Sequence, residues 1–283
     1  EGILGIVTKV IVKLLPKPAC TVDLLVPFET PRKAMDFVPY IMTEARIIPS
    51  SLEFMERSAL KMAERFLGSS LPYGDAGAHL IIQLEGNDPE LLADQYERVG
   101  DLCIEHGALE VFVADNRNTR EKLWKARKCI SEAVMAFYSR YTKEDVSVPP
   151  RAIPDLLEEV HKLAEKYGFE PVIFGHAGDG NLHVNFLVPP ENPSWEEAIE
   201  KARLELYQAT LRMGGTLSGE HGIGLKRKKY LKHFLDPGQI ELIRRIKKAF
   251  DPNLILNPCK IVEDLEEKPA NLAATEQGGT SSP

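Results

Sequence analysis

In the first part of the chain, hydrophobic and polar residues repeat in some segments with the period of a strand and in others with the period of a helix. The pattern therefore predicts both kinds of element. Short apolar runs bounded by Pro, Gly, Asn or Ser predict strands, and amphipathic stretches behind capping residues predict helices. Thr30 precedes Pro31, and Asn87 or Asp88 precedes Pro89, an order typical of helix N-termini. The expected strands are 20–26, 47–54, 78–84 and 110–113, and the expected helices are 31–45, 55–66 and 89–106. This order predicts the α+β class, with a ferredoxin-like antiparallel sheet covered by helices on one face.

The second part of the chain predicts another α+β unit of the same kind. A long helix is expected over residues 118–138, and Ser194 is expected to cap a later one. The remaining expected elements are a strand near 146–148, a helix over 153–167, strands at 171–174 and 182–188, and helices over 195–213, 226–234 and 237–250. We interpret the repetition as a duplication of ferredoxin-like units.

The two ends of the chain differ from the part between them. Residues 6–12 are strand-like, and Pro16 and Pro18 predict a linker after them. The last residues are rich in Glu, Ala, Gly, Ser and Pro, a composition typical of disorder. We therefore expect a remnant of another domain at 1–17, a main domain at 18–262 and a disordered tail at 263–283.

The segment Gly-His-Ala-Gly-Asp-Gly-Asn-Leu-His-Val-Asn, which ends at Asn185, carries two histidines with a predictable relation. Asp179-Gly180 predicts a two-residue hairpin turn, because both residue types accept the positive φ of a type I′ turn. A turn centred there places His176 opposite His183, with Cβ atoms about 4.5–5.5 Å apart. Asn185 shares their face because side chains alternate along a strand. Two facing imidazoles can bind one divalent metal ion, and the alternative is a hydrogen-bonded histidine pair that stabilises the hairpin.

A glycine-rich segment from Ser218 to Gly224 contains a carboxylate and a third imidazole. Glu220 is the natural third ligand, since two histidines and one carboxylate leave metal positions open for a substrate. His221 is not expected to point the same way as its neighbour, so we interpret it as a group behind the ligands or as a general base. The alternative is a phosphate-binding loop, although the segment matches neither a Walker motif nor the dinucleotide motif.

Several separated motifs together resemble one enzyme family. They are His176-x-Gly-Asp-Gly-Asn-x-His183-x-Asn185, Gly219-Glu220-His221-Gly222 and Asp251-Pro252-x-x-Ile255-Leu256-Asn257-Pro258. In this order they resemble the C-terminal half of FAD-linked 2-hydroxy-acid dehydrogenases of the vanillyl-alcohol-oxidase superfamily. That group includes D-lactate dehydrogenase, the glycolate oxidase flavoprotein subunit and D-2-hydroxyglutarate dehydrogenase. Residues 1–8 resemble the last strand of the family's FAD-binding domain, although Ile3 stands where the family usually has Thr.

The resemblance implies FAD and a divalent metal ion. FAD would be bound mainly by an upstream domain, because the sequence has no Gly-rich pyrophosphate loop. The residues implied to touch FAD are Gly2, Gly5, Ile6, Val7 and Asn257. The implied metal ligands are His176, His183 and Glu220, with His221 as the catalytic base, and the ion is expected to be Zn²⁺ with Mn²⁺ or Fe²⁺ as alternatives.

The resemblance also implies a small 2-hydroxy carboxylate as substrate, bound by Arg127, Ser131, Lys143 and Asn185. The spacing of Arg127 and Ser131 places them on one face of the expected long helix. A guanidinium matches a carboxylate with two parallel hydrogen bonds. The alternative is that Arg127 is one charge on a cationic helix, since Lys125 and Lys128 flank it.

Composition excludes several classes of function. A net charge of −7 argues against nucleic acid as a partner. The 4 cysteines have no metal-ligand spacing, which is typical of reduced thiols in a cytoplasmic protein. No apolar run approaches the length of a membrane span. By resemblance we expect an oligomer, a protein or quinone as electron acceptor, and peripheral membrane or multi-subunit association.

The sequence thus leads to the hypothesis of an enzyme part that binds substrate and metal while hydride passes from the substrate α-carbon to flavin N5. Two alternatives stay open. One is an FAD-dependent transferase like the ether-lipid synthases, and the other is a non-catalytic metal-binding subunit that pairs with a separate flavoprotein.

Overall fold

The computed structural model describes residues 1–190 and 194–261. These residues form two compact units, one of residues 14–221 and one that joins residues 1–13 to residues 222–261. The expected disordered tail at 263–283 lies outside the described residues, and the expected domain boundaries stay predictions.

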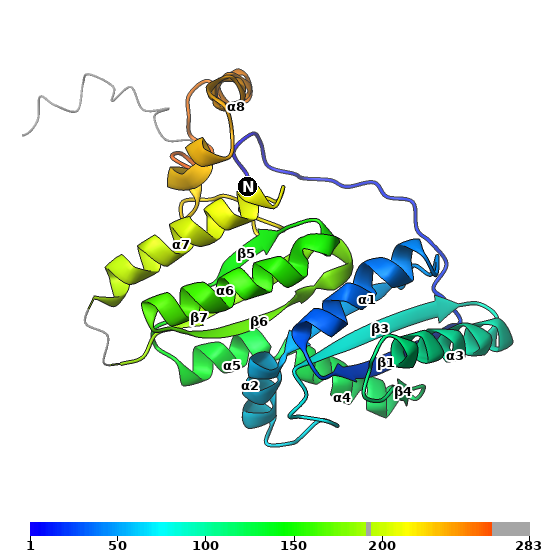
Figure 1. Cartoon of the computed structure of the whole chain (residues 1–283). Coiled ribbons are helices and arrows are strands. Elements are labelled where there is room, and N and C mark those ends of the chain that lie inside the picture. The colour runs from blue at the N-terminus through cyan, green and yellow to red at the C-terminus, as the bar shows by residue number, and fades with distance from the viewer. Residues whose placement is uncertain (191–193, 262–283) are drawn as a thin grey trace, which may run out of the picture. The chain divides into compact units, whose positions relative to one another are not determined.

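The larger unit is built on one antiparallel sheet of seven strands (Figure 1). Every pair of neighbouring strands is antiparallel, in the order β4-β1-β3-β2-β6-β7-β5. The strands are β1 (Cys20–Phe28), β2 (Ser51–Glu56), β3 (Ala78–Gly86), β4 (Phe112–Ala114), β5 (Glu144–Ser147), β6 (Glu170–His176) and β7 (Asn181–Leu187). The α+β class with an antiparallel sheet is therefore confirmed. A duplication of ferredoxin-like units stays an interpretation.

Eight α-helices are present in the described residues. They are α1 (Pro31–Thr43), α2 (Arg57–Leu67), α3 (Pro89–Glu105), α4 (Arg117–Lys128), α5 (Ile130–Phe137), α6 (Ile153–Tyr167), α7 (Trp195–Arg212) and α8 (Pro237–Phe250). Local signals place several of their ends: Thr30 and Asp88 accept backbone hydrogen bonds as N-caps, and Asp236 and Gln239 form a capping box. The segment expected as a helix over 226–234 is instead a short 3₁₀ helix, η3 (Lys228–His233).

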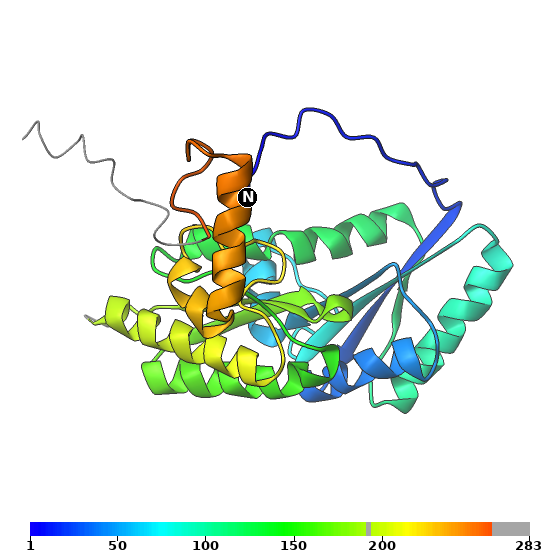
Figure 2. The same cartoon turned by 90° about the horizontal axis from the view of Figure 1, so that it is seen from above.

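The helices of the larger unit cover both faces of the sheet, so the prediction of a single covered face was wrong. Helices α2, α4 and α5 lie on one side, and α1, α3, α6 and α7 lie on the other (Figure 2). Seven consecutive residues of β1, from Val22 to Phe28, are buried. Since side chains alternate between the faces of a strand, continuous burial requires cover on both sides.

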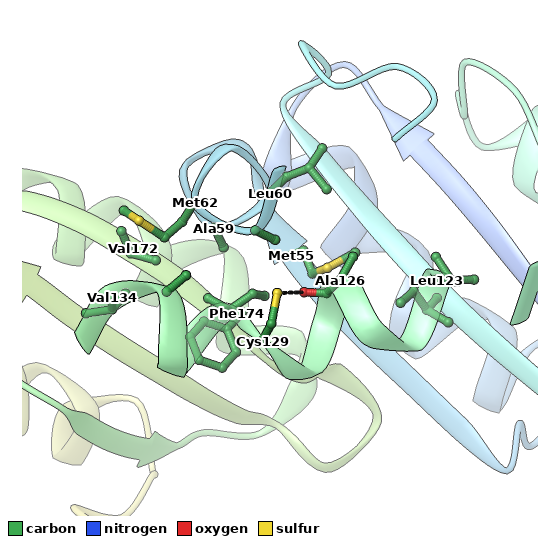
Figure 3. Close-up of a cluster of buried hydrophobic side chains, with 14 of the residues drawn as sticks. Met55, Ala59, Leu60, Met62, Leu123, Ala126, Cys129, Val134, Val172 and Phe174 are labelled. Carbon is green, nitrogen blue, oxygen red and sulfur yellow. Dashed lines mark hydrogen bonds between the residues drawn. The ribbon is translucent and has the colours of Figure 1, made fainter. Parts of the chain in front are cut away.

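The expected helix over 118–138 is divided at Cys129 into α4 and α5. Cys129 has ψ −6°, which ends the α-helical path, and its thiol donates a hydrogen bond to the Ala126 carbonyl at 3.3 Å (Figure 3). Cys129 is buried in the hydrophobic cluster where α4 and α5 meet Met55 of β2 and Phe174 of β6. The division is a packing effect, which the helical spacing of the sequence does not reveal.

One buried lysine joins separate segments of the smaller unit. Lys247 of α8 is 2 % exposed, and its Nζ donates to the carbonyls of Ile3 and Leu256 at 2.6 Å and to Asp251 Oδ2 at 2.5 Å. Residues 6–12, expected as a strand, form none in the structure. A strand needs a neighbour for its backbone hydrogen bonds, and none of the described strands pairs with this segment.

None of the helices in the described residues has both the length and the apolar character needed to cross a membrane.

Candidate metal centre

The two predicted histidines meet on one face of the sheet, although not through the predicted pairing. His176 pairs with Asn181, and His183 pairs with Phe174, so the type I′ turn was wrong. The 3₁₀ helix η2 (Ala177–Asp179) and Gly180, with φ +74°, make a four-residue connection instead. The pairing is shifted by two residues, and an even shift leaves every side chain on its expected face. The two imidazole rings are therefore diagonal neighbours with centroids 5.4 Å apart.

Gly180 explains why the longer connection forms. A Cβ added to Gly180 would lie 1.9 Å from the Val148 carbonyl oxygen, and the Val148 N–H donates to the Gly180 carbonyl at 3.0 Å. This contact with the segment after β5 fixes the connection at Gly180, where positive φ costs a glycine little.

Glu220 lies beside both histidines. One carboxylate oxygen is 3.5 Å from His183 Nε2, and the other is 3.8 Å from His176 Nε2. The three ligand atoms lie within 4.8 Å of one another. Atoms bound about 2.1 Å from a tetrahedral ion lie about 3.4 Å apart, so small inward movements would complete a site. The two-histidine, one-carboxylate set therefore fits a divalent metal ion.

The surroundings shift the pKa values of His176 and His183 in opposite directions. His176 Nδ1 is 2.8 Å from the Glu53 carboxylate, and this hydrogen bond raises the pKa of His176. Burial, with the positive charge of Arg127 as a further cause, lowers the pKa of His183 to about 4. His183 is therefore neutral near pH 7, which leaves one ring nitrogen with a lone pair for a metal ion.

The glycine-rich segment is held in place by Asp145 of β5, which is fully buried. Asp145 Oδ2 accepts hydrogen bonds from the backbone N–H of Glu220 at 3.0 Å and of His221 at 2.8 Å, and from the Ser218 hydroxyl at 3.0 Å. Burial acts to raise the pKa of Asp145, but these hydrogen bonds and the nearby charge of His221 outweigh it and hold the pKa below its usual value.

His221 turns toward its neighbour, contrary to the expectation that the two side chains diverge. Its Nε2 lies 3.2 Å from Glu220 Oε1, and its ring stacks on that of His183 with centroids 5.3 Å apart. Asp145, His183 and His221 form a second set that could hold an ion. His221 is half exposed, so it is accessible to a small molecule at the site.

A cavity of about 280 Å³ opens beside these groups and gathers all four predicted substrate residues: Arg127, Ser131, Lys143 and Asn185. Arg127 and Ser131 lie on the separate helices α4 and α5, so their expected relation on one helix was wrong even though both reach the cavity. Asn185 is buried and donates to the Val172 carbonyl at 3.2 Å. Lys143 is exposed.

The guanidinium of Arg127 is already engaged. Its Nη2 lies 2.7 Å from Glu53 Oε2, and its Cζ lies 4.8 Å from the centre of the Phe174 ring. Arg127 is 8 % exposed. It is thus a fixed cation in the wall of the cavity.

A larger cavity of about 710 Å³ lies elsewhere, among residues of α1, α2 and α6. Charged side chains around it pair with one another, as in the contacts of Arg32 with Glu158 at 2.8 Å and of His161 with Glu56 at 2.7 Å. None of the predicted site residues lines it.

Comparison with known proteins gives the same assignment as the motifs. Residues 17–261 match the family model described as FAD linked oxidases, C-terminal domain. This chain belongs to that family. It is 34% identical over 267 residues to D-lactate dehydrogenase of Anaerostipes hadrus, covering 92% of this chain and 56% of that protein. It is 34% identical over 265 residues to glycolate oxidase subunit GlcD of Escherichia coli, covering 94% of this chain and 52% of that protein. The chain therefore spans about half the length of the curated relatives it matches.

Solved structures support the fold. The chain resembles p-cresol methylhydroxylase with a TM-score of 0.64 and 16% identity, over 88% of this chain and 54% of that one. It also resembles alkyldihydroxyacetonephosphate synthase with a TM-score of 0.59 and 15% identity, over 91% and 47%. At such identities the likeness concerns the fold alone.

The residues implied to touch FAD lie in the smaller unit, and of these only Asn257 falls within the residues that the family model matches. Gly2 and Asn257 are in contact: a Cβ on Gly2 would lie 2.6 Å from Asn257 Nδ2, which donates to the Glu1 carbonyl at 2.9 Å. Ile6 and Val7 are each 80% exposed. A Cβ on Gly5 would meet open space. Their role toward FAD stays a prediction.

Sequence reasoning missed Glu53 and Asp145. Each is a buried acid with apolar neighbours in its strand: Glu53 lies between Leu52 and Phe54 in β2, and Asp145 lies between Glu144, itself a buried acid, and Val146 in β5. A carboxylate within a buried strand needs a partner, and this requirement is the signal that the sequence offered.

Proposed function

We propose that this chain is the substrate- and metal-binding part of an FAD-dependent oxidoreductase that acts on 2-hydroxy acids such as D-lactate or glycolate. The observation that carries the proposal is the grouping of His176, His183 and Glu220, two of which, His183 and Glu220, line the same cavity as Arg127 and Lys143. A metal-ion site near the positive charges of Arg127 and Lys143 suits a small carboxylate with a hydroxyl group on the adjacent carbon. The cavity of about 280 Å³ lies at the small end of ligand sites, which favours a small substrate.

Each group of the chain has a definite task in this proposal. Arg127 and Lys143 bind the substrate carboxylate and set which face of the α-carbon is presented. His221 takes the hydroxyl proton at Nε2, and Glu220 Oε1 lies 3.2 Å from that nitrogen. A divalent ion held by His176, His183 and Glu220 would supply polarisation of the substrate hydroxyl. FAD would supply the two-electron acceptor.

The first experiment is elemental analysis of the purified chain. We expect about one divalent metal ion per chain, an occupancy that follows from a single three-ligand site. His183→Ala should lose the ion, whereas His161→Ala should keep it, because His161 pairs with Glu56 outside the site. A wild-type chain that binds no metal after reconstitution under reducing conditions would contradict the proposal.

Turnover separates the proposed activity from that of a transferase. In the FAD-loaded protein, steady reduction of an electron-acceptor dye by D-lactate or glycolate would support a dehydrogenase. Carbon–oxygen exchange without net dye reduction would support a transferase like the synthase whose fold it shares. A chain that binds metal but supports neither reaction in the FAD-loaded protein would favour a metal-binding subunit.

A further inference from the structure

Glu53 of β2 connects two parts of the site that sequence reasoning treated separately. Its Oε1 accepts a hydrogen bond from His176 Nδ1 at 2.8 Å and another from the Ser51 hydroxyl at 3.0 Å. Its Oε2 lies 2.7 Å from Arg127 Nη2. Glu53 is 6 % exposed, with Oε1 hydrogen-bonded and Oε2 in an ion pair with Arg127, so its carboxylate contacts the residues of the site and is largely shielded from solvent.

The strand pairing places this carboxylate where it is. Glu53 is the direct cross-strand partner of His176, at the junction of β2 and β6. Residues opposite each other on neighbouring strands have Cβ atoms about 4.5–5.5 Å apart, which brings a glutamate within reach of an imidazole. Met55 follows on the same face, against the cluster that contains Phe174 and Cys129, so the strand is firmly seated.

The hydrogen bond has a chemical consequence for His176. A neutral imidazole that donates its Nδ1–H to a carboxylate keeps its lone pair at Nε2, the nitrogen that faces Glu220. Such a bond fixes the tautomer and the ring direction and makes the ligating nitrogen more basic. The same carboxylate holds the Arg127 guanidinium over the Phe174 ring.

Stability alone gives little reason for burying this group. A buried ion pair contributes little more than apolar side chains of the same shape, because removing both charges from water is costly. The informative fact is therefore what the pair contacts. Glu53 also bonds to His176, a metal-ligand candidate, and Arg127 lines the cavity.

We propose that Glu53 is a positioning residue that sets the ring of His176 for metal ligation and the guanidinium of Arg127 for the substrate carboxylate, so that one side chain aligns both. This inference rests on the proposed function, because it assumes that a metal ion binds at His176.

The chain contains a matched control. Glu56 lies three residues further along β2, is also buried, and also accepts a hydrogen bond from a histidine, His161, at 2.7 Å. The odd spacing places Glu56 on the opposite face of the strand from Glu53. Glu56→Gln therefore removes the charge from the same kind of contact on the same strand without touching the site.

The test measures Co²⁺ and Zn²⁺ affinity of the purified chain by competition with a chromophoric chelator. Glu53→Gln should weaken both affinities about 10–100-fold, the effect typical of losing a group that orients a metal ligand. Glu56→Gln should leave them unchanged. Glycolate should also perturb the Co²⁺ spectrum of Glu53→Gln only at higher concentration than wild type. Unchanged glycolate binding would overturn the Arg127 half of the proposal.

A second measurement needs no metal ion. Long-range ¹H–¹⁵N spectra of the histidines above neutral pH should show His176 with its proton on Nδ1 in wild type and in Glu56→Gln. In Glu53→Gln that preference should be lost, with His176→Gln identifying the signal. The double variant Glu53→Leu/Arg127→Met removes both buried charges together, so it keeps the test possible if Glu53→Gln does not fold.

The outcomes separate the two proposals. If wild type binds no metal, the proposed function fails and this role fails with it. If wild type binds metal and Glu53→Gln binds it equally well with an unchanged tautomer, only the positioning role is overturned.

Discussion

Asp145→Asn is the most informative single change outside the proposed ligand set of His176, His183 and Glu220, because it alters one charge and almost no volume. All three hydrogen bonds that Asp145 accepts, from Ser218 and from the backbone of Glu220 and His221, go to Oδ2. An asparagine with its amide oxygen at that place can keep all three as neutral bonds. The variant therefore tests what the negative charge contributes to holding Glu220.

The expected magnitude follows from the strengths of the bonds. A hydrogen bond to a charged group contributes roughly 1.5–3 kcal/mol and a neutral one roughly 0.5–1.5 kcal/mol. Three bonds weakened by about 1 kcal/mol each would lower the free energy of unfolding by about 3 kcal/mol, and sharing one acceptor reduces this to about 2 kcal/mol.

Urea unfolding followed by circular dichroism measures this loss, and chelator competition measures metal affinity. Asp23→Asn is the control, because Asp23 is also fully buried and accepts from Arg120, Trp124 and Gln83 at 2.8–3.0 Å away from the site. Both variants should lose stability, but only Asp145→Asn should also bind metal more weakly. Equal metal affinity in Asp145→Asn and Asp23→Asn would refute the reasoning.

The stability difference between wild type and Asp145→Asn should also change with pH in a defined direction. The pKa of Asp145 is lowered in the folded state, so its contribution is fully present above the unfolded value of about 3.9 and is lost as pH falls through the folded pKa. The difference between wild type and Asp145→Asn should therefore persist at neutral pH and vanish in acid. A difference that grows in acid would contradict this assignment.

Three further changes test separate parts of the site and its surroundings. Gly219→Ala would place a Cβ 2.4 Å from the side-chain oxygen of buried Asn181, so it should cost about 1–3 kcal/mol in urea unfolding and weaken metal binding; an effect no larger than that of Gly178→Ala would contradict the close contact. Arg127→Lys keeps the charge but loses the planar group, so KM for the hydroxy acid should rise more than kcat falls, and unchanged kinetics would place the anchor elsewhere. The hydrogen bond that His161 donates to Glu56 raises the pKa of His161, so this stabilisation is full below about pH 6.5 and is lost as pH rises through the folded pKa. The difference in unfolding midpoint between wild type and His161→Asn should shrink from pH 5.5 to pH 8.5, and a constant difference would count against the pairing.

Local chemistry made much of the fold predictable. The helix expected over 153–167 has those bounds in α6, and the helix expected over 237–250 has those bounds in α8. Both depend on residues within a few positions of each other. The break at Cys129 was not predictable in this way, because it depends on packing against β2 and β6. The cover on both faces of the sheet could have been inferred from the apolar run that ends β1, residues 24–28.

In the candidate site, too, residues within local motifs could be predicted from the sequence, and contacts between distant residues could not. His176, His183 and Glu220 stand in short glycine-rich motifs, so sequence alone could select them, and the wrong hairpin register did no harm because the shift was even. Glu53 is 123 residues from His176 in the chain, and Asp145 is 75 residues from Glu220. Periodicity within one element carries no information about such a pair.

The continuity of the sheet across β2 and β6 matters for the site, because it places Glu53 opposite His176. The pairing of β2 with β6 joins strands β4-β1-β3-β2 to strands β6-β7-β5, and Glu53 and His176 face each other in that pairing. The two histidine candidates thus lie in the second half of the sheet, in β6 and β7, while the carboxylate that orients one of them lies in the first half. Two separate sheets with the same strands would keep the ligands but lose that alignment. Weakening the β2–β6 contact should therefore reduce metal affinity even when every ligand is intact.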